Sequence, residues 1–340
     1  MKVAVVILNY NGRKFLEQFL PNVIASCDPA LAEVIVADNA STDDSVVFMH
    51  EHFPNIRLIE NGSNSGFSTG YNFALQQIDA QYYVLLNSDI EVTTGWIEPI
   101  IALMDADPQI AACQPKILSY YHKEQFEYAG ASGGFIDKYG YPFCRGRVFQ
   151  NLEDDKGQYD EPREVFWATG ACMFVRANLY HQIGGLDDSF FAHMEEIDLC
   201  WRLKNAGYKV YCCPQSKVYH IGGGTLPKNS PRKTYLNFRN NLSLLVKNLP
   251  KRRVKRTIFY RIILDWVAAF KFLFEGCTKD FHMVFKAHFD FYKRLKSLQT
   301  KRKENTHKMV SCIYKKNIVF QNVVLGKKKF SDLKEQDFTL

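Results

Sequence analysis

The sequence predicts an α/β fold with a mostly parallel central sheet, followed by amphipathic helices towards the C-terminus. In the first hundred residues, short apolar runs rich in β-branched residues alternate with segments of helical period, which is typical of right-handed βαβ units. Beyond Val246 the period becomes helical and the charge becomes basic. The 340 residues fit roughly two domains, or one large α/β domain with an appendage.

The first expected strand is Val3–Leu8, and the polar turn NYNG at 9–12 separates it from a helical pattern that begins at Phe15. The two residues before this strand leave no room for a secretory segment, and no small-residue cleavage site follows, so we expect a cytoplasmic protein. Its nine cysteines are then expected to be reduced thiols.

The second expected strand, Glu33–Ala37, ends at Asp38. The Ser, Thr and Asp residues at 41–45 can cap the next helix. Asp38 precedes that cluster at the strand tip, where a carboxylate can accept hydrogen bonds from a ribose hydroxyl or a base edge. A capping role and a binding role both remain open for Asp38.

A third strand is expected at Ile56–Glu60, and a glycine-containing loop follows it at 61–72. Gly66 and Gly70 permit a close backbone turn into a helix whose N-terminal amides can face a phosphate. Many strand-to-helix turns contain two glycines, so this loop alone is weak evidence for a site.

A fourth strand, Tyr82–Leu86, is cut off by Asn87-Ser88-Asp89. Ligands of open α/β sheets bind at the carboxyl ends of such strands, and a carboxylate there can hold a divalent cation against a phosphate-bearing substrate. The simpler alternative is a polar turn. A helix is expected next, at Thr93–Asp105.

The stretch from Ala112 to Tyr159 has no clear period and is expected to form irregular strands, with Arg145 and Arg147 as solvated loop residues. The strand expected at Phe166–Arg176 contains a small-residue turn, Thr169-Gly170-Ala171. Small residues let a bulky substrate approach the backbone.

Two adjacent carboxylates, Glu195 and Glu196, open a helix after the apolar anchor Phe190-Phe191. Acids in the first turn suit the helix dipole. Capping does not explain the adjacent pair, however, and a partly desolvated carboxylate near a phosphate site is a candidate general base. A further strand, Tyr208–Cys213, leads towards His220, which stands between a strand end and a glycine run. The loop at 222–230 is a candidate cover for a diphosphate.

The C-terminal region is strongly basic. Residues 246–308 contain 17 Lys and Arg against 5 Asp and Glu, an excess of +12, so the rest of the chain carries about −5 of the total of +7. Its apolar stretch Ile262–Phe274 is too short to span a bilayer. Basic and aromatic residues on amphipathic helices suit an anionic membrane, while an ordinary helical subdomain is the alternative. No nucleic-acid-binding motif accompanies the charge. The tail, Ser311–Leu340, forms a hairpin or an ordered extension.

Four motifs in order resemble the family 2 glycosyltransferases of the GT-A fold, in particular the rhamnosyltransferase-like bacterial branch. They are NYNG at 9–12, VADNAS with DDS at 36–45, NSGFSTGYN at 64–72 and LLNSD at 85–89. The resemblance covers residues 1–245. It implies that Asp89 binds a Mg²⁺ or Mn²⁺ ion on a nucleotide-sugar diphosphate, and that His220 is a second metal ligand. Asn87 replaces the first acid of the family's DXD motif and is expected to hydrogen-bond instead.

The resemblance also implies a catalytic base. The family usually has Glu-Asp where this chain has Glu195-Glu196, so the base is expected at Glu196, one methylene longer, with Glu195 as the alternative. The other residues expected to bind the nucleotide-sugar are Asn9, Asp38, Asn64, Gly66, Asn72, Asn87, Thr169, Gly170 and Lys233.

The resulting hypothesis is an inverting glycosyltransferase that moves a sugar from a UDP- or dTDP-sugar to a saccharide or lipid-linked saccharide in surface polysaccharide synthesis. It comprises a GT-A-like domain (1–245), a basic helical segment (246–310) and a tail (311–340), and it binds peripherally to the inner face of the cell membrane. One alternative is a sugar nucleotidyltransferase, which usually has a Gly-rich, Arg-containing loop where this chain has NYNG. The other is a non-catalytic membrane-bound scaffold.

Overall fold

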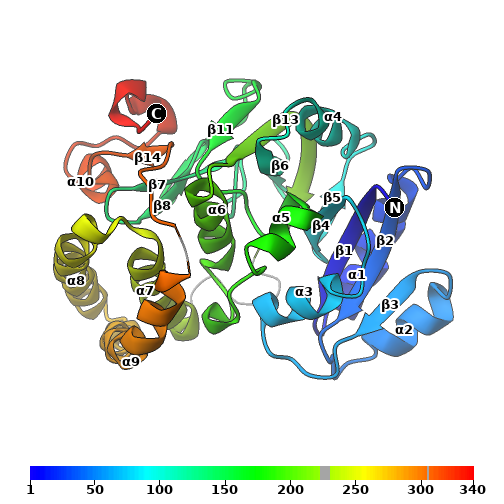
Figure 1. Cartoon of the computed structure of the whole chain (residues 1–340), viewed down its shortest axis with the longest axis horizontal. Helices are drawn as coiled ribbons and strands as arrows, with labels where there is room; N and C mark the ends of the chain where they lie inside the picture. Colours follow the sequence, from blue (N-terminus) through cyan, green and yellow to red (C-terminus); the bar gives the residue numbers. More distant parts are fainter. Residues whose placement is uncertain (223–229, 305) are drawn as a thin grey trace.

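A nine-stranded sheet forms the centre of the computed structural model, which describes residues 1–222, 230–304 and 306–340. Its strands run in the order β11-β13-β6-β12-β4-β1-β2-β3, with β5 paired to β13 (Figure 1). The N-terminal half confirms the expected βαβ alternation, since its four strands are parallel. These elements are β1 (Val3–Asn9), α1 (Arg13–Ala25), β2 (Ala32–Asp38), α2 (Ser45–His52), β3 (Arg57–Glu60), α3 (Phe67–Leu75) and β4 (Tyr82–Asn87).

The second half of the sheet mixes strand directions. β12 runs antiparallel to both β4 and β6, whereas β13 runs parallel to β6. β13 is a single strand with a register shift between Cys213 and Lys217, which interrupts its apolar pattern. The elements are β5 (Ile90–Val92), α4 (Glu98–Ala106), β6 (Ile110–Ser119), β11 (Arg163–Val165), β12 (Cys172–Arg176), α5 (Ala177–Gln182), α6 (Glu195–Asn205) and β13 (Lys209–His220).

Both faces of the sheet are buried, as expected for a largely parallel sheet. Val5 and Val84 face one side and pack in a cluster with residues of α1 and α4. Val6 and Leu85 face the other side, in a cluster that includes Tyr71 of α3 and residues of α6. Because the two faces are covered, the open edge at the strands' carboxyl ends is left for a ligand.

The stretch after Ala112 differs from the expectation of irregular strands. Its first part belongs to the ten-residue strand β6, which lies inside the main sheet. Arg145 and Arg147 are buried rather than solvated: Arg145 pairs with Glu161, and Arg147 lies over the Tyr128 ring. The rest forms part of a five-stranded second sheet, made of β7 (Gly134–Asp137), β8 (Pro142–Cys144), β9 (Arg147–Val148), β10 (Asn151–Leu152) and β14 (Ile313–Tyr314).

The tail is an ordered extension rather than a separate hairpin. β14 pairs in parallel with β7, and Phe330 and Phe338 contact the Phe135 ring in the main core. The short helix α10 (Ile318–Val323) lies between them in sequence, and short 3₁₀ helices lie at Asp188–Phe190, Phe330–Asp332 and Glu335–Asp337.

Three long helices lie together at the side of the molecule away from β1–β3 (Figure 1). They are α7 (Pro231–Asn248), α8 (Lys251–Phe274) and α9 (Thr278–Lys303). Within the described ranges, no helix has both the length and the apolar character needed to cross a bilayer.

Candidate active site

The tips of three parallel strands meet at one edge of the sheet. Their register places Asn9 opposite Asp38 and Leu8 opposite Asn87. The Asn9 amide donates to Asp38 over 3.1 Å, and the Asp38 carboxylate also accepts from the backbone and hydroxyl of Ser41. Asp38 is therefore buried in a polar turn, and the Asn9 Oδ1 atom is buried without a partner among the described residues.

The glycine loop lies against these tips. Asn39 Nδ2 donates to Asn64 Oδ1 over 3.0 Å and to the Gly66 carbonyl over 3.2 Å, so an amide network holds the turn. Gly66 has a φ of 99°, and a Cβ there would lie 2.6 Å from the Phe191 carbonyl oxygen. The position therefore requires glycine for its conformation and for the close approach of the segment after α5.

The expected metal ligands lie side by side. Asp89 Oδ1 is 3.2 Å from His220 Nε2, and Glu127 Oε2 is 3.3 Å from His220 Nδ1. All three side chains are buried. Burial disfavours the charged imidazole, but Glu127 and Asp89 outweigh that effect and raise the pKa of His220 to about 10.

Asp89 and His220 supply the donor types that a divalent cation accepts from a protein, a carboxylate oxygen and an imidazole nitrogen. Among the described residues, no group of three His, Cys, Asp or Glu side chains is arranged to hold a metal ion. The arrangement therefore fits an ion that takes two ligands from the protein and the rest from a diphosphate and water.

The carboxylate pair opens α6. Glu195 is buried, and burial together with the neighbouring Glu196 charge raises the pKa of Glu195 well above its usual value. Burial also raises the pKa of Glu196, to about 7, although backbone amides oppose the shift. The Oε2 atoms of both carboxyls are buried without a hydrogen-bond partner in the described part of the chain. Glu196 therefore has the pKa that a general base near neutral pH would need.

The segment before this helix, which we call the strap (188–194), has an unusual backbone. Phe191, His193 and Met194 all have positive φ, in the left-handed region that non-glycine residues rarely adopt. The Asn240 amide donates to the carbonyls of Phe190, Ala192 and His193 over 2.8–3.0 Å. α7 therefore holds the strained strap that leads into Glu195.

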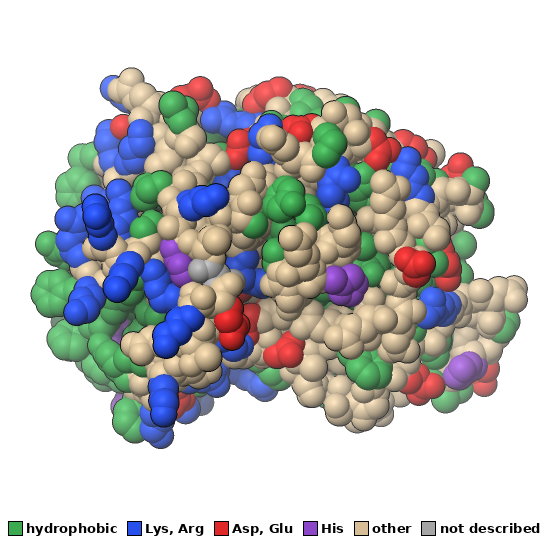
Figure 2. Space-filling model, viewed as in Figure 1, with side chains coloured by type: hydrophobic (Ala, Val, Ile, Leu, Met, Phe, Trp, Pro, Cys, Tyr) green, Lys and Arg blue, Asp and Glu red, His purple; other side chains and the backbone are tan. Residues whose placement is uncertain are grey.

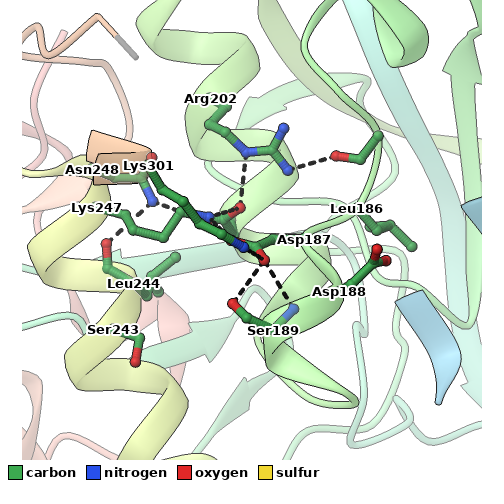
Figure 3. Close-up of polar contacts among 12 residues, drawn as sticks. Leu186, Asp187, Asp188, Ser189, Arg202, Ser243, Leu244, Lys247, Asn248 and Lys301 are labelled. Atoms are coloured by element: carbon green, nitrogen blue, oxygen red, sulfur yellow. Dashed lines mark hydrogen bonds and ion pairs between the residues drawn. The ribbon is translucent and has the colours of Figure 1, made fainter. Parts of the chain in front are cut away.

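A buried charge network anchors the strap at its other end (Figure 3). Asp187 pairs with Lys247 of α7 and Lys301 of α9, and Lys247 also lies 2.9 Å from Asp198 of α6. Arg202 completes the network, with 2.8 Å between its Nε and Asp198. Asp198 orders the helix start, so its carboxylate is not free for chemistry.

The remaining expected residues fall into two groups. The Thr169–Ala171 turn lies beside Asn87, whose backbone N–H donates to the Ala171 carbonyl over 2.9 Å, and Gly170 packs next to Glu196 and Phe67. Asn72 lies further back: both ends of its amide bond to protein groups, including the Leu186 carbonyl and the Tyr180 hydroxyl.

Lys233 lies near His193. Burial of the His193 imidazole and, to a smaller extent, the Lys233 charge lower the pKa of His193 to about 4. Residues 223–229 of the expected covering loop lie outside the described residues. Sequence reasoning missed Glu127 and Asn39. Glu127 stands in a stretch without periodicity, so no local signal marks it, whereas Asn39 stands directly after a strand tip and could have been found there.

The fold is that of a GT-A glycosyltransferase. The family model "Glycosyl transferase family 2" matches residues 4–184, more than half of the chain, so this protein is a family 2 glycosyltransferase and acts on sugar donors. The N-acetylglucosaminyl-diphospho-decaprenol L-rhamnosyltransferase of Mycobacterium tuberculosis is 28% identical over 233 residues, which are 64% of this chain and 75% of the relative.

Two solved structures show the same fold. GalNAc-T7 with UDP, GalNAc and Mn²⁺ has a TM-score of 0.58 at 16% identity, and the match covers 74% of this chain but only 48% of that one. The mannosyltransferase PcManGT of Pyrobaculum calidifontis, in complex with GDP-Man and Mn²⁺, has a TM-score of 0.53 at 16% identity over 89% of this chain and 84% of that one. At these identities the likeness establishes the fold alone.

Proposed function

We propose that this protein is an inverting, metal-dependent transferase that moves a sugar from a UDP- or dTDP-sugar to a hydroxyl of a saccharide or lipid-linked saccharide in surface polysaccharide synthesis. The observation that carries the proposal is Glu196, a carboxyl with a pKa of about 7 and an unpartnered Oε2 atom. It lies beside Gly170, in the turn that leads into β12, and β12 pairs with β4, the strand that ends at Asn87.

The donor is expected to bind along the strand tips. Asn9 and Asp38 would contact the nucleoside, with the buried Asn9 Oδ1 as the unfilled acceptor. The loop of Asn64 and Gly66 would hold the diphosphate, with Lys233 on the strap side. Asn72 then acts by holding α3 to the segment after α5.

Asp89 and His220 would hold the Mg²⁺ or Mn²⁺ ion. A bound cation neutralises negative charge on the leaving diphosphate. That two distant relatives in fold were solved with Mn²⁺ supports a divalent ion here.

Glu196 would take the acceptor's hydroxyl proton as the acceptor oxygen bonds to the anomeric carbon. The bond from that carbon to the diphosphate breaks at the same time and from the opposite side, so configuration inverts. Glu195 is a poor base because burial and the Glu196 charge keep its carboxyl protonated. This favours Glu196 over Glu195.

The acceptor side is proposed to lie against an anionic membrane. α8 exposes apolar side chains at helical spacing, among them Phe259, Trp266 and Phe270. Its first turns carry exposed Lys and Arg residues with no ion pair in the described part of the chain. Figure 2 shows hydrophobic and basic side chains together on the side where α8 and α9 lie. Such a face suits interfacial binding, and the relative's lipid-linked substrate name agrees with it.

The test is hydrolysis of a panel of UDP- and dTDP-sugars by the full-length protein, with and without Mn²⁺. We expect metal-dependent release of UDP or dTDP that Asp89→Ala lowers by about a hundredfold or more, since it removes one of two protein ligands. Glu91→Ala, which removes a half-buried carboxylate two residues away that pairs with Lys123, is the control. Hydrolysis that survives EDTA and Asp89→Ala alike would contradict the metal role.

A further inference from the structure

A hollow of about 560 Å³ lies between the strap, α7 and α9. It is separate from the strand tips, because the strap stands between them: the Phe191 carbonyl accepts from Phe67 N–H at the glycine loop, while the Ser189 carbonyl accepts from Arg294 over 2.9 Å. Its lining consists of Asp188, Ser189, Phe191, Arg232, Tyr235, Leu236, Arg239, Arg294, Ser297 and Leu298.

Three arginines line this hollow, and none of them forms an ion pair among the described residues. Arg239 is buried and donates to the Asn240 side-chain oxygen and the Phe190 carbonyl, and Arg294 donates to a backbone carbonyl. Arg232 lies 5.0 Å from the centre of the Phe191 ring.

Positive charge is crowded here. Burial lowers the pKa of Arg239, a hydrogen bond to Tyr235 opposes that shift, and the nearby Arg294 charge adds to it. Asp188 is the one acid of the lining, and its carboxylate already accepts from Asn72 over 2.7 Å. Arg239 is buried, Arg294 is half-buried and Arg232 is exposed, so an anion that entered the hollow would meet guanidinium groups from the buried end to the rim.

The form of the cluster indicates which anion fits. Guanidinium groups bind phosphate oxygens through paired N–H donors, and several arginines around one hollow suit a diphosphate. Phe191, Leu236 and Leu298 give the hollow apolar walls. Such walls can accommodate an alkyl chain attached to the phosphate.

We infer that this hollow binds the phosphate or diphosphate group of the acceptor, on the opposite side of the strap from the donor. The inference rests on the proposed transfer to a lipid-linked acceptor. α9, which supplies Arg294, also packs against α8, the helix with the exposed apolar face. A diphosphate held here therefore lies next to the helices that we propose to face the membrane.

The test uses three full-length variants that each lower the net charge by one unit. Arg294→Gln removes a guanidinium, Ser297→Glu adds a carboxylate to the exposed rim without removing a side-chain contact, and Lys296→Gln is the control outside the lining. Binding of inorganic pyrophosphate is measured by calorimetry in EDTA. We expect the first two to weaken binding by about tenfold, and the control by less than about twofold.

A kinetic experiment identifies the source of the phosphate. With a diphosphate-linked saccharide lipid as acceptor, Arg294→Gln and Ser297→Glu should raise the acceptor KM, and they should leave both the donor KM and the KM for the same saccharide as an alkyl glycoside unchanged. Equal pyrophosphate binding by all variants, or an equal loss in Lys296→Gln, would overturn the site. A rise in donor KM alone would assign the hollow to the donor instead. The pyrophosphate titration needs no turnover, so its outcome is independent of the donor-hydrolysis test.

Discussion

At the scale of single residues, the two adjacent glutamates differ in what their surroundings allow. Glu195 is enclosed and its pKa is raised well above the usual range by burial and by the Glu196 charge. Glu196 keeps part of its surface open, and burial raises its pKa only to about 7. One carboxyl is therefore held as a neutral neighbour and the other can change its protonation state near neutral pH.

Glu196→Gln should abolish transfer while leaving donor affinity unchanged, because the amide fills the same space and cannot accept the proton. In the unsubstituted protein, kcat/KM should fall as pH drops through about 7, since protonation removes the base. The pH profile of transfer and calorimetric donor binding measure the two effects. Glu195→Gln is the matched control, and a larger loss of transfer in it would move the role to Glu195.

The polar residues that the sequence places at strand ends do lie at strand ends, while their binding roles stay predictions. The structure brings Asn9, Asp38, Asn87 and Asp89 to one edge because their strands are parallel and in register. Glu127 could not be predicted, since it reaches His220 from a stretch that pairs with β6 by isolated bridges and has no period of its own.

At the scale of elements, the glycine loop and the strap are fitted to each other. The Gly66 position has no room for a side chain, because the Phe191 carbonyl and ring both lie within 3.0 Å of a Cβ placed there. Gly62, four residues earlier, also has a positive φ but has open space around it. A side chain at Gly62 would therefore meet only an unfavourable backbone conformation, whereas one at Gly66 would also overlap with the strap.

Gly66→Ala should destabilise the protein by about 1–3 kcal/mol more than Gly62→Ala, because Gly66 (φ 99°, ψ 179°) has a backbone conformation open essentially to glycine alone and its Cβ would also clash, whereas Gly62 has a positive φ without a clash. Urea unfolding of the two variants measures the difference. The displaced strap should also weaken transfer in Gly66→Ala. Equal destabilisation of the two variants would show that the loop and the strap can move apart without a cost in stability.

The elements that sequence patterns predicted well are those with local signals. The first four strands and the Glu195 helix lie within a residue or two of their expected positions. The helix after β5 begins at Glu98 rather than Thr93, because residues 93–97 form the turn after β5, where the Thr93 hydroxyl donates to the Lys217 carbonyl of β13. Pairing between strands that are far apart in the sequence cannot be seen in local periodicity. The same kind of pairing explains why Arg145 and Arg147 are buried.

At the scale of the whole molecule, the basic helices and the catalytic sheet face different surroundings. The exposed apolar residues of α8 are concentrated on one face, as in helices that lie on bilayers. The domain boundaries at 245 and 310 stay a prediction, although the tail's Phe330 and Phe338 join the same core as the sheet.

The triple variant Phe259→Ser, Trp266→Ser and Phe270→Ser should lose most of its co-sedimentation with anionic vesicles. It removes apolar area that would be buried in the interface, while the basic turns remain. Val47→Ser, Phe73→Ser and Tyr121→Ser together remove comparably exposed apolar groups from the sheet domain and should have no effect. Equal loss in the two triple variants would contradict a specific membrane face.

The strap has a consequence for how such enzymes can be recombined. The match to the family model ends at Gly184, just before the strap. The matched portion of the chain therefore carries the strand tips but neither glutamate of the pair nor His220. Asn240 and Lys247 fix the strap from α7, which lies outside that portion. A hybrid of two such proteins that is joined at the end of the matched region must therefore take the strap, α6 and the C-terminal helices together from one parent. A splice between strap and α7 would leave the left-handed residues unsupported and the base misplaced.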